Sequence, residues 1–339
     1  MRIAVLHDDI PDAAAPDAAD VLVQAETVSA ALKRFGHDVV ALPCTLNLDA
    51  LHRRIEAEKP DVVFNLVESI NGQGALIHLV PFCLDSWEIP YTGAPAAAIL
   101  ETSNKIMAKE RMVANGLPTA TWEGPFPGRR SLVAGNFESA REDEIITWII
   151  KSVWEHASIG LDADGLVEET RAGIWPVLRL RATALGGACF AETYIDGREF
   201  NLSILTGIDG PEVLPPAEII FAGFAPDKPK IVDYRAKWDE DSYEFRHTPR
   251  CFDFDDRDVP LIGVLKALAL RCWKAFGLAG YARVDFRVDQ AGRPWILEVN
   301  TNPCLSPDAG FAAAAARAGL SFDDIVLRIL DQAVEYRYR

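Results

Sequence analysis

Short apolar runs alternate with amphipathic stretches over residues 1–92. Three runs are typical of buried strands, and two longer stretches carry apolar residues at helical spacing. The expected strands are Arg2–Leu6, Asp38–Leu42 and Val62–Leu66, and the expected helices are Val21–Phe35 and Leu48–Glu58. Strands that alternate with helices favour a parallel sheet. Because ligands bind such sheets beyond the carboxyl ends of the strands, we expect binding loops after the first and third strands.

The pattern changes after the turn-rich segment Ile89–Gly93. Thr102 or Ser103 is expected to cap a helix that ends at Asn115–Gly116. The segment Glu155–Gly165 is small and polar, which is typical of a mobile loop. Further strands are expected at Ile145–Val153, Ala188–Ile195, Glu199–Leu205, Tyr281–Val288 and Trp295–Val299, and amphipathic helices at Pro260–Phe276 and Phe322–Val334.

Length and charge narrow the classes of protein to consider. A chain of 339 residues suggests two or three domains. Its 34 basic and 50 acidic residues give a net charge of −16, which disfavours nucleic acid and anionic membranes as partners. No apolar run approaches the roughly 20 residues of a membrane span, and the first run is too short for a signal peptide. Six cysteines without a C-x-x-C pair indicate a reduced, cytoplasmic protein.

The most informative segment is YARVDFRVDQAGRPWILEVNTNP, residues 281–303. Side chains two apart share one face of a strand, so a tight hairpin would bring four polar groups together. These are Arg283, Asp285, Glu298 and Asn300, whereas Val284, Phe286, Leu297 and Val299 would turn to the other face. Oxygen ligands suit Mg²⁺, and the arginine would hold a developing anion. On spacing alone, a solvated hairpin face explains the same residues equally well.

The same segment resembles the ATP-grasp superfamily, and most closely its D-alanine–D-alanine ligase branch. Other motifs of that branch occur in the same order along nearly the whole chain. They are Pro90–Gly93, Ser103–Lys105, Asn115–Pro118, Lys151 with Ser158–Gly160, Glu192–Phe200 and Leu297–Pro303. The resemblance implies an α/β chain with the ATP-grasp fold. It implies an N-terminal Rossmann-like domain (1–92), a central subdomain with a mobile phosphate loop (93–190) and a C-terminal subdomain with the metal site (191–339).

The resemblance also implies roles for single residues. Lys105 and Lys151 would neutralise the phosphates of ATP, and Lys237 would lie near the transferred phosphate. The loop that includes Glu155 and Ser158 would close over the phosphates. Glu192, Tyr194 and Ile195 would belong to the segment that binds adenine, Glu199 would hold the ribose, and Phe286 and Leu297 would line the adenine pocket. Asp285, Glu298 and Asn300 would bind one or two Mg²⁺ ions, or Mn²⁺, and Arg283 with the backbone near Cys304 would stabilise the tetrahedral intermediate.

The residues expected around the amino-acid substrates depart from the ligase pattern. Asp20 stands in the region of an early glutamate, Ala157 replaces a serine, and Trp238 replaces a tyrosine. The stretch Leu305–Gly310 replaces a serine-containing motif. The candidate substrate residues are therefore Asp20, Glu68, Trp238, Cys304 and Asp308. For each acid, a surface carboxylate or a helix cap remains an open alternative.

The sequence therefore predicts a magnesium- and ATP-dependent ligase that joins a small carboxylate to a small amine through an acyl phosphate. The altered pocket predicts that the substrates are not two D-alanines. A true D-alanine–D-alanine ligase with an atypical pocket, an inactive ATP-binding protein and a kinase that forms a stable acyl phosphate remain alternatives. The resemblance leaves a homodimer open.

Overall fold

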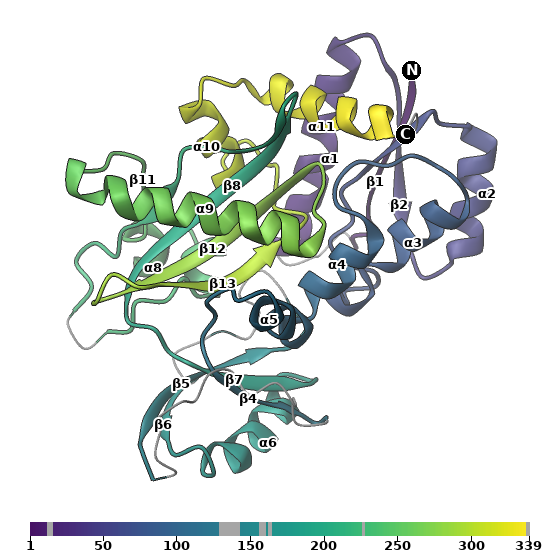
Figure 1. Cartoon of the computed structure of the whole chain (residues 1–339). Helices are drawn as coiled ribbons and strands as arrows, with labels where there is room; N and C mark the ends of the chain where they lie inside the picture. Colours follow the sequence, from purple (N-terminus) through teal and green to yellow (C-terminus); the bar gives the residue numbers. More distant parts are fainter. Residues whose placement is uncertain (12–15, 129–142, 156–160, 162–164, 226–227, 337–339) are drawn as a thin grey trace.

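The computed structural model describes the chain except residues 12–15, 129–142, 156–160, 162–164, 226–227 and 337–339 (Figure 1). The described strands form three sheets. None of the helices in the described residues combines the length and apolar character needed to cross a bilayer.

The first sheet is small and parallel, as the alternation of strands and helices predicts. Its strands lie in the order β2 (Asp38–Cys44), β1 (Arg2–Asp8) and β3 (Val62–Asn65). Helix α1 (Pro16–Arg34) packs on one face together with the C-terminal helix α11 (Phe322–Tyr336). Helices α2 (Leu48–Glu58) and α3 (Leu79–Ser86) pack on the other face. The expected strands and helices are present here, and α1 begins earlier than expected.

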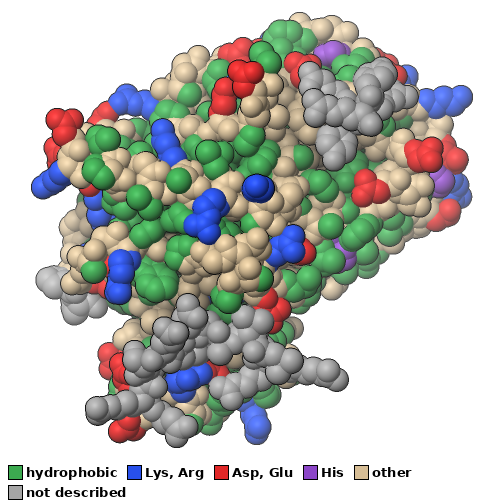
Figure 2. Space-filling view, in the orientation of Figure 1, with side chains coloured by type: hydrophobic (Ala, Val, Ile, Leu, Met, Phe, Trp, Pro, Cys, Tyr) green, Lys and Arg blue, Asp and Glu red, His purple; other side chains and the backbone are tan. Residues whose placement is uncertain are grey.

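The second sheet is antiparallel and carries the predicted hairpin. Its strands are β11 (Arg250–Cys251), β10 (Ala217–Ile219), β8 (Gly197–Gly207), β12 (Tyr281–Asp289) and β13 (Pro294–Asn300), with β9 (Gly210–Val213) paired to β8. Alternate apolar residues of β8 and β12 face a core that is covered by α4 (Ala96–Ser103), α5 (Lys105–Ala114) and α9 (Val259–Phe276). Helix α10 (Gly310–Arg317) and helix α11 both pack against β8 of this sheet and against each other. Figure 2 shows hydrophobic side chains along the outer surface of α9 as well, where Val264 and Leu270 are exposed.

The third sheet is antiparallel and stands apart from the other two in Figure 1. Its strands lie in the order β4 (Trp122–Phe126), β7 (Cys189–Thr193), β5 (Ile146–Ser152) and β6 (Leu166–Glu169). Helix α6 (Ile174–Ala184) covers one face. Two short helices, α7 (Tyr234–Trp238) and α8 (Tyr243–Arg246), follow in the connection between β10 and β11.

One sequence-based expectation, the helix cap, is wrong, and one expected domain border stays a prediction that we refine. The helix cap is neither Thr102 nor Ser103, which lie in the last turn of α4, but Asn104. The Asn104 Oδ1 atom accepts hydrogen bonds from the Ile106 and Met107 amides, both at 3.0 Å, and so satisfies the first turn of α5. The border expected between residues 190 and 191 falls inside β7, so we propose that it lies at the turn between β7 and β8.

Candidate active site

The β12–β13 hairpin brings the predicted polar face together. Arg283 lies opposite Asn300, and Asp285 lies opposite Glu298. The turn is fixed by the Asp289 carboxylate, which accepts hydrogen bonds from the backbone amides of Ala291 at 3.0 Å and Arg293 at 2.9 Å. This local closure sets the register that aligns the two polar pairs.

One detail of the hairpin was predicted wrongly. The register shifts between Asp285 and Phe286, so Ile296 rather than Leu297 lies opposite Phe286. Phe286 and Ile296 are fully buried in the core under α9, whereas Leu297 is only half-buried. An extra residue at a β-bulge moves its side chain out of the regular alternation, which explains why Leu297 does not face that core.

Arg283 and Asp285 form a two-pronged ion pair. The Arg283 Nε atom lies 2.7 Å from Asp285 Oδ1, and its Nη2 atom lies 2.8 Å from Oδ2. Asn201 Nδ2 donates a further hydrogen bond to Asp285 Oδ1 at 2.8 Å. Burial raises the pKa of the Asp285 carboxyl, Arg283 opposes the shift, and the charge of Glu298 adds to it. The Arg283 guanidinium is also 3.8 Å from Glu298 Oε1, so it lies between both carboxylates.

The donor set of the hairpin fits Mg²⁺. The carboxylates of Asp285 and Glu298 lie opposite each other on paired strands, where Arg283 offsets part of their repulsion and a bound cation would offset more. Asn300 Oδ1 accepts one hydrogen bond, from the Asn302 amide at 3.0 Å, and an amide oxygen has a second lone pair for a metal. Within the described ranges, no group of three or more His, Cys, Asp and Glu side chains has metal-binding geometry. The set Asp285, Glu298 and Asn300 differs from such a group because its third ligand would be the amide oxygen of Asn300.

Lysine side chains from two different elements lie near this hairpin. Lys105, the first residue of α5, donates to the Glu155 carbonyl, and desolvation lowers the pKa of its ammonium to about 8 although Glu298 opposes the shift. Desolvation also lowers the pKa of Lys237 in α7, against the attraction of Glu298. Asp233 caps α7 by accepting from the Ala236 amide at 2.8 Å, and this fixes the helix that carries Lys237. Positive charge is therefore concentrated locally in an acidic chain.

Lys109 is a functional candidate that the sequence analysis missed. Its ammonium lies 2.8 Å from Glu192 Oε2, and both side chains are only 2% exposed. Lys109 also donates to Thr119 Oγ1 and the Ala120 carbonyl, each at 2.9 Å, while Lys151 pairs with the other oxygen of Glu192. Burial disfavours the charged carboxylate, but the two lysines outweigh burial and lower the pKa of Glu192 to about 2. The sequence did carry one indication that Lys109 is buried, because it lies among the apolar residues on the inner face of α5.

Glu199 also has a partner that was not foreseen. Its Oε2 atom lies 3.2 Å from Arg287 Nη2, and Arg287 donates further to the Gly197 carbonyl at 3.0 Å. Burial raises the pKa of Glu199, and Arg287 opposes that shift. The Tyr194 ring lies 5.8 Å from the Arg287 guanidinium, and the Tyr194 hydroxyl accepts from the Lys230 amide at 3.1 Å. These contacts hold the β7–β8 connection, where adenine binding was predicted.

Three of the five candidate substrate residues lie together, and the other two lie elsewhere. Asp20, Glu68 and Cys304 lie together, because Asp20 and Glu68 share the Gln24 amide and Cys304 donates to Asp20. Trp238 follows Lys237 at the end of α7, and Asp308 is exposed, with its carbonyl accepting from Arg250 at 3.1 Å. Ser158 and Ala157 lie outside the described residues. The half-buried Ile195 lies directly after Tyr194.

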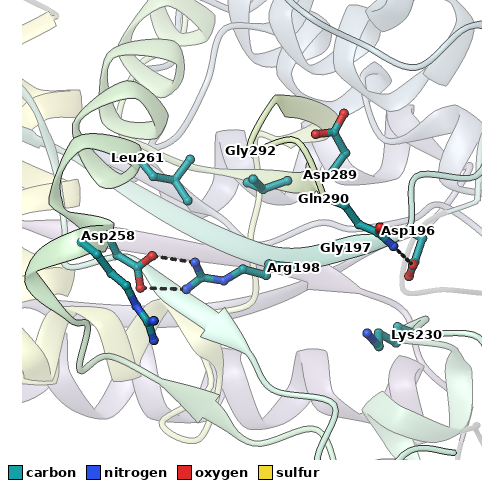
Figure 3. Close-up of a pocket in the computed structure, with 11 residues that line it drawn as sticks. Asp196, Gly197, Arg198, Lys230, Asp258, Leu261, Asp289, Gln290 and Gly292 are labelled. Carbon is teal, nitrogen blue, oxygen red and sulfur yellow. Dashed lines mark hydrogen bonds and ion pairs between the residues drawn. The ribbon is translucent and has the colours of Figure 1, made fainter. Parts of the chain in front are cut away.

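A cavity of about 510 Å³ opens beside the β7–β8 turn and the hairpin turn (Figure 3). Asp196, Gly197, Gln290 and Gly292 line it, and Arg198 within it is bonded to Asp258 at 2.7 Å. Arg198 and Glu199 are neighbours on β8, so their side chains point to opposite faces of the sheet. The cavity contains Arg198 and Leu261 of α9, and it therefore lies on the face that α9 covers. The polar cluster lies on the opposite side, and the cavity is therefore separate from it.

Comparisons with known proteins agree with this geometry. Residues 112–331 match the family described as "D-ala D-ala ligase C-terminus". The chain is 30% identical over 312 residues to the D-alanine–D-alanine ligase of Methylococcus capsulatus, covering 91% of this chain and 90% of that protein. It is 30% identical over 323 residues to the D-alanine–D-alanine ligase of Moorella thermoacetica, covering 93% and 94%. The structure of D-alanine–D-alanine ligase from Bacillus anthracis complexed with ATP superposes with a TM-score of 0.72 at 20% identity, covering 100% of this chain and 99% of that one.

Proposed function

Since the chain belongs to the D-alanine–D-alanine ligase family, we propose that it joins a carboxylate to an amine through an acyl phosphate, with substrates other than two D-alanines. Its fold is the ATP-grasp fold expected from the sequence, and it is a ligase that forms C–N bonds. The identity of the two substrates and the roles of single residues are part of the proposal.

The observation that carries the proposal is that Lys105 and Lys237 lie near Glu298 of the carboxylate hairpin, beside Arg283 of the same hairpin, with Lys151 near Lys105. Lys105 and Lys151 would hold the phosphates of ATP, and Lys237 would hold the phosphoryl group in transfer. Glu298 lies within electrostatic reach of Lys105 and Lys237, and Arg283 lies beside it. When bound, Mg²⁺ would neutralise phosphate charge, held by Asp285, Glu298 and Asn300. The adenine and ribose would lie toward Tyr194, Ile195, Leu297 and Glu199.

The chain's own residues would contribute position and charge. The γ-phosphoryl group passes from ATP to a carboxylate oxygen of the first substrate, which leaves ADP and an acyl phosphate. The amine then attacks the acyl carbon, the bond to the phosphate oxygen breaks, and the nitrogen loses a proton. Arg283 would stabilise the negative charge that develops on the carbonyl oxygen, because its guanidinium is held in place by Asp285. Lys237 would hold the phosphoryl group in line for transfer.

The rewritten substrate region supports substrates other than D-alanine. Asp20 accepts hydrogen bonds from the side chains of Cys304 and Ser306, at 2.9 and 2.7 Å. Gln24 also donates to Asp20 at 3.3 Å, and a carboxylate with three internal donors has less capacity for a substrate ammonium. Leaving a substrate group without its partner costs about 1–3 kcal/mol for each lost bond. The relatives in Methylococcus capsulatus and Moorella thermoacetica favour the alternative, a D-alanine–D-alanine ligase with an atypical pocket, because both are D-alanine–D-alanine ligases.

The proposal also covers the cellular compartment and the oligomeric state of the enzyme. We propose a cytoplasmic protein, which is supported by six cysteines that are all free thiols. A homodimer stays a prediction, and light scattering of the purified protein would measure its mass in solution.

The test is to incubate the protein with ATP, Mg²⁺ and pools of amino acids, D-alanine among them. ADP release and the masses of the products are recorded. We expect a product whose mass equals acid plus amine minus water, formed only when both are present. Arg283→Ala should abolish the product. Arg293→Ala is the matched control, because this exposed arginine lies in the turn of the same hairpin. Dipeptide formation from D-alanine alone would contradict the proposed specificity, and ADP release without amine dependence would contradict the ligase reaction.

A further inference from the structure

A set of side-chain hydrogen bonds ties helix α1 to the loop that follows the metal hairpin. This loop, residues 301–306, is called the 301–306 loop below. Asp20 Oδ1 accepts from the Ser306 hydroxyl at 2.7 Å, and Asp20 Oδ2 accepts from the Cys304 thiol at 2.9 Å. The Ser306 amide donates to the Cys304 sulfur at 3.3 Å, so the two side chains and the carboxylate form one connected group.

Gln24 extends this group by one helical turn. It lies four residues after Asp20 and therefore on the same face of α1. Although polar, Gln24 is only 2% exposed. Its Oε1 atom accepts from the Leu305 amide at 2.9 Å, and its Nε2 atom donates to Glu68 at 2.8 Å and to Asp20 at 3.3 Å. A buried amide with partners on both ends orients the groups it touches.

The 301–306 loop is held from other sides as well. Thr301 and Thr102 share a hydrogen bond of 3.1 Å, and Asn302 bonds to the Tyr281 hydroxyl at 2.6 Å and to the Val67 carbonyl at 3.0 Å. Outside the loop, the Leu305 amide and the Ser306 hydroxyl each bond to a side chain of α1, and the Leu305 side chain is buried in the core that α1 shares with β1 and β3. If the two hydrogen bonds to α1 are lost, the second half of the loop is held by the packing of Leu305.

The 301–306 loop follows directly after the carboxylate strand and reaches Arg283. Asn300 ends β13, and its side chain accepts from the Asn302 amide at 3.0 Å. Asn300 lies opposite Arg283 in the hairpin, so the loop leaves β13 beside that arginine. The backbone of this loop therefore borders the place where, under the proposed function, the acyl carbon would be attacked.

We propose that Asp20 and Gln24 are positioning residues, which hold the 301–306 loop beside Arg283 through Cys304, Leu305 and Ser306 and do not bind the substrate themselves. This inference rests on the proposed function, because it assigns the loop to the reacting centre. It replaces the sequence-based assignment of Asp20 as a ligand for a substrate ammonium. Its physical basis is that both oxygens of Asp20 already accept hydrogen bonds from the loop.

A positioning role and a binding role predict different kinetics. Loss of a direct contact to a substrate ground state raises the KM of that substrate. Displacement of a loop at the reacting centre lowers kcat, and a misplacement of about 1 Å costs on the order of 100-fold. Asp20→Ala should therefore lower kcat by about 10- to 100-fold while the KM values of ATP and of both substrates change less than about threefold. Asp20→Asn retains one acceptor oxygen and should recover part of the rate.

The decisive readout needs no turnover. Hydrogen–deuterium exchange would be measured for the Leu305 amide in the full chain, since this amide bonds to Gln24. Gln24→Met has a similar size and no acceptor oxygen, so it should speed exchange at Leu305 and leave strand β1 protected. Glu26→Gln, on the exposed side of the same helix, is the matched control and should change neither exchange nor kcat.

The exchange and kinetic results together distinguish a positioning role of Asp20 and Gln24 from a substrate-binding role. Faster Leu305 exchange in Gln24→Met together with a kcat loss in Asp20→Ala supports the proposal. Unchanged Leu305 exchange would overturn it, and so would an Asp20→Ala variant that raises only the KM of one substrate. The double variant Asp20→Ala/Ser306→Ala should be no slower than Asp20→Ala alone, because both act through one contact. If the wild-type protein forms no amide product, the proposed function fails, while the exchange experiment still tests whether α1 holds the loop.

Discussion

Glu192→Gln tests a buried carboxylate of the candidate site that two lysines contact. The Glu192 carboxylate lies between the ammonium groups of Lys109 and Lys151, and it is 2% exposed. The substitution keeps the shape of the side chain and removes its charge. Lys109 would then retain only neutral acceptors, Thr119 Oγ1 and the Ala120 carbonyl among them.

The expected loss of stability follows from the pKa of Glu192. The two lysines lower this pKa from 4.5 to about 2 in the folded chain. A carboxyl with a depressed folded pKa stabilises the fold above its unfolded value of 4.5, and this stabilisation is lost as the pH falls toward 2. The difference of about 2.5 pH units corresponds to roughly 3 kcal/mol at pH 7. This agrees with the roughly 3–5 kcal/mol that follows from breaking a buried pair by removing one partner.

Urea unfolding followed by circular dichroism would measure the effect. At pH 7 the Glu192→Gln variant should unfold with a free energy roughly 3 kcal/mol smaller than the wild type, and the difference should narrow as the pH falls below 4.5. Glu168→Gln is the control, because Glu168 is an exposed acid on β6 of the same sheet, and it should change the stability by less than about 0.5 kcal/mol. A loss below about 1 kcal/mol at pH 7, or a difference that widens on acidification, would refute the reasoning.

Two further predictions concern ATP and metal. Because desolvation lowers the pKa of Lys105 to about 8, its ammonium loses its charge as the pH rises through that value, so the KM for ATP should rise between pH 7 and 9. Lys105→Arg should flatten this dependence, and an identical pH profile in both proteins would argue against Lys105 as a phosphate ligand. Glu298→Gln removes one of the two facing carboxylates, so half-maximal activity should require at least about tenfold more Mg²⁺. An unchanged Mg²⁺ titration would place the metal elsewhere.

The polar face of the hairpin could be predicted because it depends on local geometry. Residues two apart share a face, and a five-residue turn fixes which residues of the two strands meet. The same reasoning missed the β-bulge, since the sequence carries no signal for the extra residue that moves Leu297 away from the core. It also chose Thr102 or Ser103 as a helix cap, although Asn104 is an equally good capping residue one position later.

The charge pairs that complete the site could not be predicted in this way. Lys109 meets Glu192 because α5 packs beside β7, a strand far along the chain. Arg287 meets Glu199 because β12 pairs with β8, and Asp20 meets Cys304 because the N-terminal domain lies against the C-terminal one. Each of these contacts depends on the packing of distant segments, which residue spacing alone does not specify.

The central claim is that a carboxylate is activated as an acyl phosphate and then joined to an amine. Once the substrate pair is known, the most direct measurement is the fate of oxygen-18 placed in the carboxylate of the acid substrate. We expect one labelled oxygen in the inorganic phosphate for each amide formed, because the bond between the acyl carbon and that oxygen breaks when the amine attacks. Amide formation with unlabelled phosphate, and with the expelled labelled oxygen recovered in AMP or in water, would contradict the acyl phosphate and the mechanism built on it.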